Sequence, residues 1–315
     1  MIRDISNKIN TLRTAKAQAL VFCNQSSVEM IKEKKIPKGD VFEFARAAGF
    51  LGAKNTSNLI PHCHPIGIDS FKIDFEYLDE KNFKQYTTLD QFKPGIVILT
   101  EAKYIGRTGN EIEAITGASI AALTLFDMLK PFDDDLEIGS VRVIEKTGGK
   151  SGAKYFKTSP TCAVLVCSDS TFKGTREDSS GKIIKKMLQE QKAKVVAYTI
   201  LPDEIDLIQK QIISWVDKDI QFIFTSGGTG LSPKDKTIEA VEEILEREAA
   251  GITEAMRSHG QIRTPLAMMS RSIAGTIKKT TIITLPGSSN GAKESLEAIL
   301  PAVFHARKML ESGGH

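Results

Sequence analysis

The apolar and polar positions predict a different kind of fold in each half of the chain. From residue 161 onward, short runs that are continuously apolar alternate with amphipathic segments. This pattern is typical of parallel strands that are covered on both faces and connected by helices. The predicted strands are 162–167, 195–201, 220–225 and 273–285, and the predicted helices are 183–188, 205–216 and 292–310. The C-terminal half is therefore expected to be an α/β domain with a doubly wound, mostly parallel sheet.

The N-terminal half mixes helical periodicity with segments that are rich in β-branched and aromatic residues, which indicates an α+β domain. Asp40 precedes one of the predicted helices and is a suitable N-cap. The predicted helices are 11–34, 41–54 and a long one from about 112 onward, and the predicted strands are 68–79, 84–101 and 138–145.

Length and composition fit two globular domains. The chain has 315 residues, of which 41% are hydrophobic and 26% charged, and a domain has about 150 residues. The polar segment 153–160 ends in a proline and is the predicted linker, so the expected domains are 1–152 and 161–315. A net charge of +3 argues against a nucleic-acid-binding protein.

The cysteines and the apolar runs bear on the cellular location. The four cysteines form no Cys-x-x-Cys pair, which argues against a zinc site or a disulfide framework and fits reduced thiols. We find no apolar run of membrane-spanning length and no signal-peptide pattern at the N-terminus. We therefore expect a cytoplasmic protein without a membrane partner.

A glycine-rich loop after the strand 220–225 is the first candidate for a phosphate-binding site. Glycines let backbone N–H groups approach an anion, and the start of a helix favours negative charge. Asp235 follows the loop and suggests Mg²⁺, because a carboxylate beside bound phosphate needs a cation. The alternative is that the glycines only form a tight turn. The loop consists of Ser226, Gly227, Gly228, Thr229 and Gly230.

Two more acids of this half, Asp169 and Asp203, also follow predicted strands. Ligands of open α/β sheets bind at the carboxyl ends of the strands, so we expect these acids to converge with the loop. Taken alone, Asp203 is equally well explained as an acid at a helix N-terminus.

In the N-terminal half, the segment Leu59-Ile-Pro-His-Cys-His-Pro-Ile66 places polar groups between two prolines that stiffen the chain. It is either a binding edge or a segment with an ordinary buried histidine. Lys54, at the end of a predicted helix, either complements the helix dipole or points into a site.

The long predicted helix has a thin polar stripe, since Glu113, Thr116, Thr124 and Asp127 fall close together at 100° per residue. Lys130 is three residues beyond Asp127, so the two can form an ion pair. The stripe is expected to be partly buried, which is how Asp and Lys become acid–base catalysts. The alternative is a solvated stripe with an ordinary ion pair. Lys146 and Lys150, in a glycine-rich tail, are either solvated or cover an anionic substrate.

Residues 1–150 resemble the family of cyclic pyranopterin monophosphate synthase, also called molybdenum cofactor biosynthesis protein C. Four motifs carry the resemblance: Leu-Ile-Pro-His-Cys-His-Pro at 59–65, Gly-Arg-Thr-Gly-Asn-Glu-Ile-Glu-Ala-Ile-Thr at 106–116, Asp-Met-Leu-Lys at 127–130, and Lys-Thr-Gly-Gly-Lys-Ser-Gly at 146–152. His62 and Asn110 stand where the family usually has apolar residues.

This resemblance implies a ferredoxin-like fold, often hexameric, with active sites at subunit contacts. The implied reaction converts a cyclised, GTP-derived triphosphate into cyclic pyranopterin monophosphate and pyrophosphate, with no tightly bound cofactor. Asp127 would be the catalytic acid–base and Lys130 its cationic partner. The implied substrate-binding residues are Lys54, His62, Cys63, His64, Glu111, Ile112, Glu113, Lys146 and Lys150.

Residues 160–308 resemble molybdopterin adenylyltransferase and its relative, molybdenum cofactor biosynthesis protein B. The matching motifs are Ser-Asp at 168–169, Asp-Ser-Ser-Gly at 178–181, Pro-Asp-Glu at 202–204, Thr-Ser-Gly-Gly-Thr-Gly at 225–230, Asp-Lys-Thr at 235–237 and Leu-Pro-Gly-Ser at 285–288.

This second resemblance implies Mg²⁺- and ATP-dependent transfer of AMP to molybdopterin, usually by a trimer. Asp203 and Asp235 would be catalytic or would hold Mg²⁺. The implied substrate-binding residues are Ser168, Asp169, Ser226, Gly227, Gly228, Thr229, Gly230, Pro286, Gly287 and Ser288.

Together the two resemblances imply a bifunctional enzyme of molybdenum cofactor synthesis. Its partners would be small pterin and nucleotide substrates, further copies of the chain in a trimer or hexamer, and other enzymes of the same synthesis. The alternative is that the C-terminal half binds molybdopterin without adenylylating it. A P-loop kinase is disfavoured, because Ile144 stands where that motif needs its first glycine.

Overall fold

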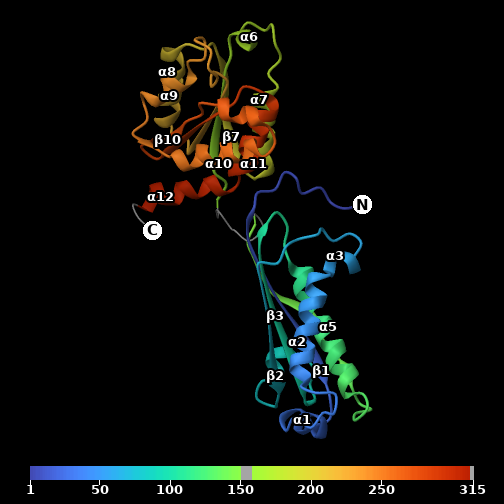
Figure 1. Ribbon diagram of the computed structural model, residues 1–315. Helices are drawn as coiled ribbons and strands as arrows, with labels where there is room; N and C mark the ends of the chain where they lie inside the picture. Colours follow the sequence, from blue (N-terminus) through green and yellow to red (C-terminus); the bar gives the residue numbers. More distant parts are fainter. Residues whose placement is uncertain (150–157, 313–315) are drawn as a thin grey trace. The chain divides into compact units, whose positions relative to one another are not determined.

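The computed structural model describes residues 1–149 and 158–312, and the chain divides into two compact units, Met1–Ala153 and Lys154–His315 (Figure 1). Most of the predicted linker 153–160, as well as Lys150, lies outside the described residues. Each unit has its own sheet and its own hydrophobic core.

The N-terminal unit is an antiparallel sheet with its main helices on one face. Its elements, in chain order, are β1 (Thr11–Phe22), α1 (Gln25–Lys32), α2 (Val41–Lys54), α3 (Thr56–Leu59), β2 (Ser70–Leu78), α4 (Phe83–Tyr86), β3 (Gly95–Gly106), α5 (Glu111–Leu129), β4 (Glu137–Ile138) and β5 (Arg142–Thr147).

The sheet has the strand order β2-β3-β1-β4, and β5 also pairs with β1. All of these pairings are antiparallel. The chain therefore follows a β-α-β-β-α-β course, which is the order of elements in a ferredoxin-like fold. In Figure 1, α2 and α5 run side by side along the sheet.

Small residues bring α2 and α5 close together. A Cβ added to Gly49 of α2 would collide with Ile73 and with the Gly117 carbonyl of α5, and one added to Gly52 would collide with Ile120. Small residues within 117–122 of the long helix predict close packing with another element, and this prediction is confirmed. The expected N-cap is also confirmed, because the Asp40 side chain accepts hydrogen bonds from two N–H groups at the start of α2.

The prediction of a helix over 11–34 is wrong for its first half. Residues 11–22 form the central strand β1, and only 25–32 are helical. Ala15, Ala17, Ala19 and Val21 recur at every second position and are buried, which is the period of a strand. The helix propensity of alanine exceeds that of most other residues by less than about 1 kcal/mol per residue. Pairing of β1 with strands on both sides overrides that preference.

Three other predictions for this unit need correction. The segment 84–101 begins with the short helix α4 and becomes a strand only at Gly95, and 138–145 contains two strands, β4 and β5. The sequence also predicts an apolar face of the long helix that includes Ile112 and Leu123, and this prediction is partly wrong. Ile112 and Leu123 are exposed, whereas the buried face consists largely of small residues.

Among the described helices, α5 has the length and hydropathy of a membrane span, so the expectation that no apolar run has that length is wrong for residues 111–129. However, 56% of that window is buried inside the unit, and the core helix of a globular domain passes the same test. The apolar character of α5 is explained by its position over the sheet.

The C-terminal unit is an α/β sandwich. Its elements are β6 (Thr161–Cys167), α6 (Asp169–Phe172), α7 (Ser180–Glu190), β7 (Lys194–Leu201), α8 (Ile205–Val216), β8 (Phe222–Ser226), α9 (Thr237–Glu242), β9 (Arg247–Glu248), α10 (Ala250–Gln261), the 3₁₀ helix η2 (Pro265–Met269), β10 (Ala274–Ile277), β11 (Thr280–Leu285), α11 (Ser289–Ile299), η3 (Ala302–His305) and α12 (Ala306–Ser312).

The sheet of this unit has the order β7-β6-β8-β11-β10-β9. The first four strands are parallel to one another, and β10 and β9 pair antiparallel at the other side. Two hydrophobic clusters cover the two faces, one with α7, α10 and α11 and the other with α8 and α9. The predicted mostly parallel sheet with helices on both faces is confirmed.

Two boundaries in this unit differ from the prediction. The strand region 273–285 is a hairpin, β10 and β11, and the helix 292–310 is divided into α11, η3 and α12. Pro301 causes the second difference, because a proline in a helix interior removes an N–H donor and clashes with the preceding turn.

Candidate active sites

In the C-terminal unit, the carboxyl ends of β6, β7, β8 and β11 meet at one edge of the sheet. A pocket of about 290 Å³ opens there, and it is lined by predicted residues from each strand end. The predicted residues in its wall are Ser168, Asp203, Ser226, Gly227, Gly228, Asp235, Gly287 and Ser288. The expected convergence of strand ends is therefore found.

Gly227 and Gly228 are required by the shape of this pocket. Their φ angles are +101° and +62°, which residues with a Cβ rarely adopt. A Cβ on Gly227 would also collide with the Cys167 carbonyl, and one on Gly228 would collide with Thr237 and Asp203. Glycine at 228 lets the backbone pass close to the carboxylate of Asp203, and glycine at 227 lets it pass close to the Cys167 carbonyl.

Asp203 is the most perturbed carboxylate of the pocket. Its Oδ1 accepts a hydrogen bond of 3.2 Å from Thr237, and its backbone N–H donates to Asp169 Oδ1 at 3.3 Å. Burial, together with the charges of Asp169 and Asp235, raises the pKa of Asp203 to about 6. Such a shift is frequent at functional sites.

Asp235 is positioned by its own loop and by Arg271. The Asp235 carboxylate accepts a hydrogen bond of 3.1 Å from the N–H of Ser232. The Arg271 guanidinium donates to the carbonyls of Gly230 and Asp235 at 2.7 and 2.9 Å. Arg271 thus holds both ends of the segment that follows the glycines.

Three of the predicted residues lie beside this pocket rather than in its wall. Thr229 is buried, and its carbonyl accepts a hydrogen bond from the Arg271 N–H. Gly230 belongs to the segment held by Arg271. Asp169 contacts Asp203, whose backbone N–H donates to Asp169 Oδ1.

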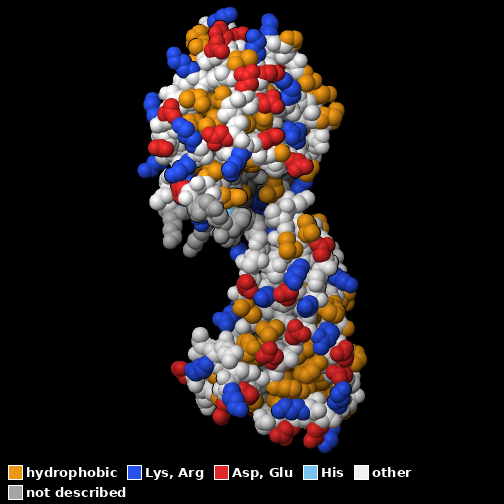
Figure 2. All heavy atoms as spheres, turned by 90° about the vertical axis from the view of Figure 1, so that its left-hand side faces the viewer, with side chains coloured by type: hydrophobic (Ala, Val, Ile, Leu, Met, Phe, Trp, Pro, Cys, Tyr) orange, Lys and Arg blue, Asp and Glu red, His pale blue; other side chains and the backbone are white. Residues whose placement is uncertain are grey.

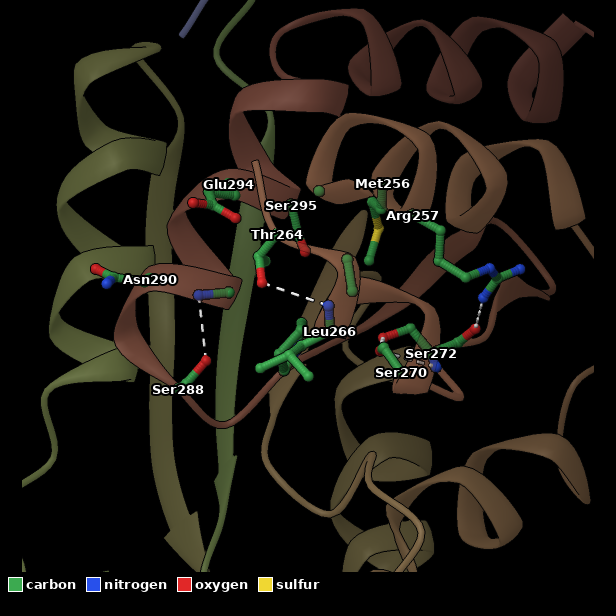
Figure 3. A pocket seen from close by; sticks show the side chains of 14 residues that line it. Met256, Arg257, Thr264, Leu266, Ser270, Ser272, Ser288, Asn290, Glu294 and Ser295 are labelled. Atoms are coloured by element: carbon green, nitrogen blue, oxygen red, sulfur yellow. Dashed lines mark hydrogen bonds between the residues drawn. The ribbon is translucent and has the colours of Figure 1, made fainter. Parts of the chain in front are cut away.

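Pro286 lines a second pocket, of about 420 Å³, together with Ser288 (Figure 3). In Figure 3, Thr264, Leu266 and Met256 face this pocket from the α10–η2 side, and Ser288, at the start of α11, lies across from them. Ser288 lines both pockets and caps α11 by accepting a hydrogen bond of 3.2 Å from Gly291.

Sequence reasoning assigned no site role to several residues at the pocket of about 290 Å³, although 178–181 is one of the matching motifs. Asp178 accepts a hydrogen bond of 2.8 Å from the Gly181 N–H and another from the Tyr198 hydroxyl, and Ser226 donates to Ser180 at 2.9 Å. The pattern Asp-x-x-Gly before an apolar helix was the available signal, since it is typical of a helix N-terminus. Nothing local indicated Tyr198.

In the N-terminal unit, Asp127 lies between two lysines near the C-terminal end of α5. Lys130 Nζ is 2.8 Å from Asp127 Oδ1, as the spacing predicted, and Lys38 Nζ is 3.0 Å from Oδ2. Hydrogen bonds and charge from Lys130, then from Lys38, lower the pKa of Asp127. Lys38 was missed, because it comes from the loop before α2 and only the fold brings it to α5.

The expected burial of the polar stripe is correct at one end only. Glu113 is 3% exposed, and burial, its largest influence, raises its pKa. The Asp127 side chain is 58% exposed, so its partial burial was a wrong expectation for the isolated chain. Near its C-terminal end, the side of α5 that carries Asp127 is not covered by neighbouring elements.

The N-terminal end of α5 gathers a second set of predicted residues. Cys63 Sγ donates to Glu113 Oε1 at 3.6 Å, and burial and the Glu113 charge raise the pKa of Cys63 to about 11. Lys146 Nζ is 3.0 Å from Glu111 Oε1. His64 Nε2 is 2.8 Å from the Arg3 carbonyl oxygen.

The remaining predicted residues of this unit, Lys54, His62 and Ile112, are exposed. The two sets on α5 are far apart, because Glu113 and Asp127 are separated by about 21 Å of helix at 1.5 Å per residue. One chain alone therefore does not bring Asp127 and His64 to the same small ligand.

Within residues 1–149 and 158–312, no group of three or more His, Cys, Asp or Glu side chains is arranged to hold a metal ion. The pocket of the C-terminal unit nevertheless places two of its carboxylates, Asp203 and Asp235, beside a glycine loop. This donor set fits Mg²⁺, which is usually bound by one or two carboxylates together with substrate phosphates.

Comparison with known proteins agrees with the two-unit architecture. Residues 2–149 match the MoaC family, and residues 163–305 match the model of a probable molybdopterin binding domain. A molybdenum cofactor biosynthesis bifunctional protein of Chlorobaculum tepidum is 39% identical over 99% of this chain and 95% of its own length. The chain belongs to the family of molybdenum cofactor biosynthesis bifunctional proteins.

Each unit of this bifunctional family member also has separate relatives. A cyclic pyranopterin monophosphate synthase of Clostridium perfringens (strain SM101) is 46% identical over 49% of this chain and 89% of its own length. The solved structure of the molybdopterin biosynthesis enzyme MoaB of Thermus thermophilus is 42% identical, covering 48% of this chain and 95% of that one with a TM-score of 0.46.

Proposed function

We propose that the N-terminal unit converts (8S)-3',8-cyclo-7,8-dihydroguanosine 5'-triphosphate to cyclic pyranopterin monophosphate and pyrophosphate. The observation that carries this proposal is the carboxylate of Asp127 held between Lys38 and Lys130. The match to the MoaC family over 2–149 supports the same reaction.

In this proposal Asp127 accepts and returns a proton at its carboxylate. Its lowered pKa keeps it ionised at neutral pH, which suits a general base that becomes an acid after accepting a proton. Lys130 and Lys38 hold the carboxylate in place. Lys146 and Lys150 neutralise phosphate charge, and His64 and Glu113 position the substrate.

The distance of about 21 Å between the two ends of α5 leads us to propose that a second copy of the chain completes the site. Apolar side chains are available for such contacts on the helices, since Phe44 and Leu51 of α2 and Leu123 of α5 are each more than half exposed. A homo-oligomer, trimeric or hexameric, would follow from such contacts.

Mixing two inactive variants tests the shared site. Asp127→Asn and Lys146→Gln chains are each expected to lose turnover. Mixed by unfolding and refolding together, they should regain about a quarter of wild-type activity if each site takes one residue from each of two copies. A mixture that stays inactive would show that both residues act from the same chain, and near-normal turnover by Asp127→Asn alone would remove Asp127 from the mechanism.

For the C-terminal unit we propose transfer of AMP from ATP to molybdopterin. The supporting observation is the common pocket of Asp203, Asp235 and the glycine loop. The loop N–H groups would bind a phosphate. Asp203 and Asp235 would hold Mg²⁺, which would neutralise phosphate charge. Pro286, Gly287 and Ser288 would border the nucleotide between the two pockets.

Pyrophosphate release by the full chain, supplied with molybdopterin and Mg²⁺-ATP, tests this activity. The substrate of the N-terminal unit is left out, so that any pyrophosphate comes from the C-terminal unit. Release by the wild type and its loss in Asp203→Asn would support adenylylation. Binding of molybdopterin without release at saturating substrate would leave only the alternative, a non-catalytic molybdopterin-binding domain.

The face drawn in Figure 2 agrees with small-molecule rather than nucleic-acid partners. Lys and Arg side chains are interspersed with Asp and Glu over this face of each unit, and the described residues there form no extended basic patch.

A further inference from the structure

The pocket of about 290 Å³ in the C-terminal unit has a wall rich in carboxylates, which are Glu177, Asp178, Asp203 and Asp235. Among the residues that the structure describes, Arg176, in the loop between α6 and α7, supplies the one cationic side chain of this wall. A wall of this charge repels the phosphates of a nucleotide unless cations offset it. The Mg²⁺ that Asp203 and Asp235 would hold offsets only part of that charge.

The guanidinium of Arg176 is not neutralised by the carboxylates around it. Within the part of the chain that the structure describes, the Arg176 side chain is exposed and forms neither an ion pair nor a hydrogen bond. Glu177, its neighbour in the chain, pairs instead with Lys182 at 2.5 Å. Asp178 is buried and accepts its hydrogen bonds from the start of α7 and from Tyr198. The positive charge of Arg176 is therefore available to a ligand of the pocket.

The backbone of the loop that carries Arg176 is held at two points. The Ser170 carbonyl oxygen accepts hydrogen bonds from the N–H groups of Thr175 and Arg176, at 3.0 and 3.2 Å, and from the Thr175 hydroxyl at 2.9 Å. Farther along, the Ser179 hydroxyl accepts a hydrogen bond of 2.7 Å from Ser289, at the start of α11. A long side chain on a fixed base loses less entropy when it binds than one on a free loop.

We propose that Arg176 binds the terminal phosphates of ATP and stabilises the negative charge that develops on the leaving pyrophosphate. The guanidinium suits this role, because it stays charged and donates two parallel hydrogen bonds to phosphate oxygens. The inference rests on the proposed adenylylation by the C-terminal unit. Arg176 would then be a catalytic residue of that reaction.

The step that Arg176 assists is a displacement at the α-phosphorus of ATP. An ionised oxygen of the acceptor forms a bond to this phosphorus, and the bond from the phosphorus to the bridging oxygen breaks. The electron pair of the broken bond stays on the pyrophosphate, so that the charge of the leaving group rises. A donor that is aimed at developing charge lowers the barrier more than it strengthens binding of the substrate.

Pyrophosphate release by the full chain, supplied with molybdopterin and Mg²⁺-ATP but not with the substrate of the N-terminal unit, measures this role. Arg176→Gln removes the charge, and Arg176→Lys keeps a charge without the fork of donors. Lys173→Gln is the matched control, because Lys173 is exposed in the same segment and does not line the pocket. Fluorescence of the buried Trp215 during urea unfolding shows whether each variant is folded.

Arg176→Gln is expected to lower kcat about a hundredfold, the effect of removing one donor to a developing oxyanion. It should also weaken inhibition by added pyrophosphate about tenfold, at an unchanged KM for molybdopterin. Arg176→Lys should recover part of kcat, and Lys173→Gln should keep all of it. Wild-type kcat and wild-type inhibition in Arg176→Gln would overturn the inference. A change confined to the KM for molybdopterin would overturn it as well, since Arg176 would then bind the acceptor.

Calorimetric titration with Mg²⁺-ATP separates the role of Arg176 from the proposed adenylylation. If the wild type releases no pyrophosphate, adenylylation is rejected and the titration alone decides on the contact between Arg176 and phosphate. Weaker ATP binding by Arg176→Gln than by Lys173→Gln would support that contact, and equal binding would overturn it. Release by the wild type, together with an unaffected Arg176→Gln, would reject the role of Arg176 and leave adenylylation in place.

Discussion

Lys38 Nζ lies 3.0 Å from Asp127 Oδ2 and 2.9 Å from the carbonyl oxygen of the same residue. Lys130 contacts the other carboxylate oxygen at 2.8 Å. Each oxygen of the proposed acid–base group thus has its own lysine, and one of the two comes from a loop about 90 residues earlier in the chain.

Replacement of Lys38 by Gln should lower kcat of the N-terminal reaction by about ten- to hundredfold, since the carboxylate loses one of the groups that hold it. The same change should raise the pKa of Asp127 toward its ordinary range, because Lys38 lowers it in the wild type. The acidic limb of the pH–rate profile should therefore move to higher pH.

Lys93→Gln is the control for this prediction. Lys93 forms a 2.7 Å pair with Glu137 in the same unit, at similar exposure, and exposed pairs contribute little to stability. Its removal should leave the profile unchanged. An unshifted profile in Lys38→Gln would contradict the role given to Lys38.

Gly228→Ala should destabilise the C-terminal unit by about 1–3 kcal/mol, because alanine is strained at a φ of +62°. Its Cβ would also collide with Thr237 and Asp203, so pyrophosphate release should fall. Gly251→Ala is the matched control. It lies in α10 with nothing within 4 Å of an added Cβ, and alanine there should stabilise the unit by up to about 1 kcal/mol. Equal effects of the two substitutions would contradict the assigned geometry.

Asp203→Asn should abolish the proposed adenylylation yet make the C-terminal unit more stable at pH 8. The folded pKa of about 6 is above the ordinary 3.8, so the folded unit binds this proton more tightly than the unfolded chain. Stability from this group is therefore lost as the pH rises from about 4 to 6. Asparagine avoids that loss. Because Asp203 is partly solvated, we expect the substitution to raise the free energy of unfolding by only about 1 kcal/mol.

Urea unfolding monitored by tryptophan fluorescence tests the pH dependence. The chain has one tryptophan, Trp215, which is buried in α8, so the signal reports on the C-terminal unit alone. The stability gain of Asp203→Asn should be full above pH 6 and should shrink toward pH 4. A gain that does not depend on pH would show that ionisation of Asp203 is not its cause.

Arg271→Gln should lower the free energy of unfolding of the C-terminal unit by about 1–3 kcal/mol, because two backbone carbonyls lose their donor. It should also raise the KM for ATP, since the loop that carries Asp235 is released. The control is Lys278→Gln, which removes an exposed pair with Asp217 at 2.9 Å. Similar stability losses in the two variants would argue against a specific role for Arg271.

The sequence by itself determined the α/β character of the C-terminal half and the residues around its glycine loop. Continuously apolar runs specify strands covered on both faces, and a parallel sheet necessarily brings the carboxyl ends of those strands to one edge. Asp203, Ser226 and Asp235 could therefore be placed together without coordinates, and the spacing of Asp127 and Lys130 on one helix could be read in the same way.

Only the tertiary structure decided the contacts between residues that are far apart in the chain. The strand character of residues 11–22 depends on pairing with β3 and β5, which overrides the helix preference of alanine. Lys38 reaches Asp127, Tyr198 reaches Asp178, and Asn110 is buried without partners among the described residues. Local periodicity contains no information on such contacts, because they depend on how strands and helices from distant parts of the chain pack together.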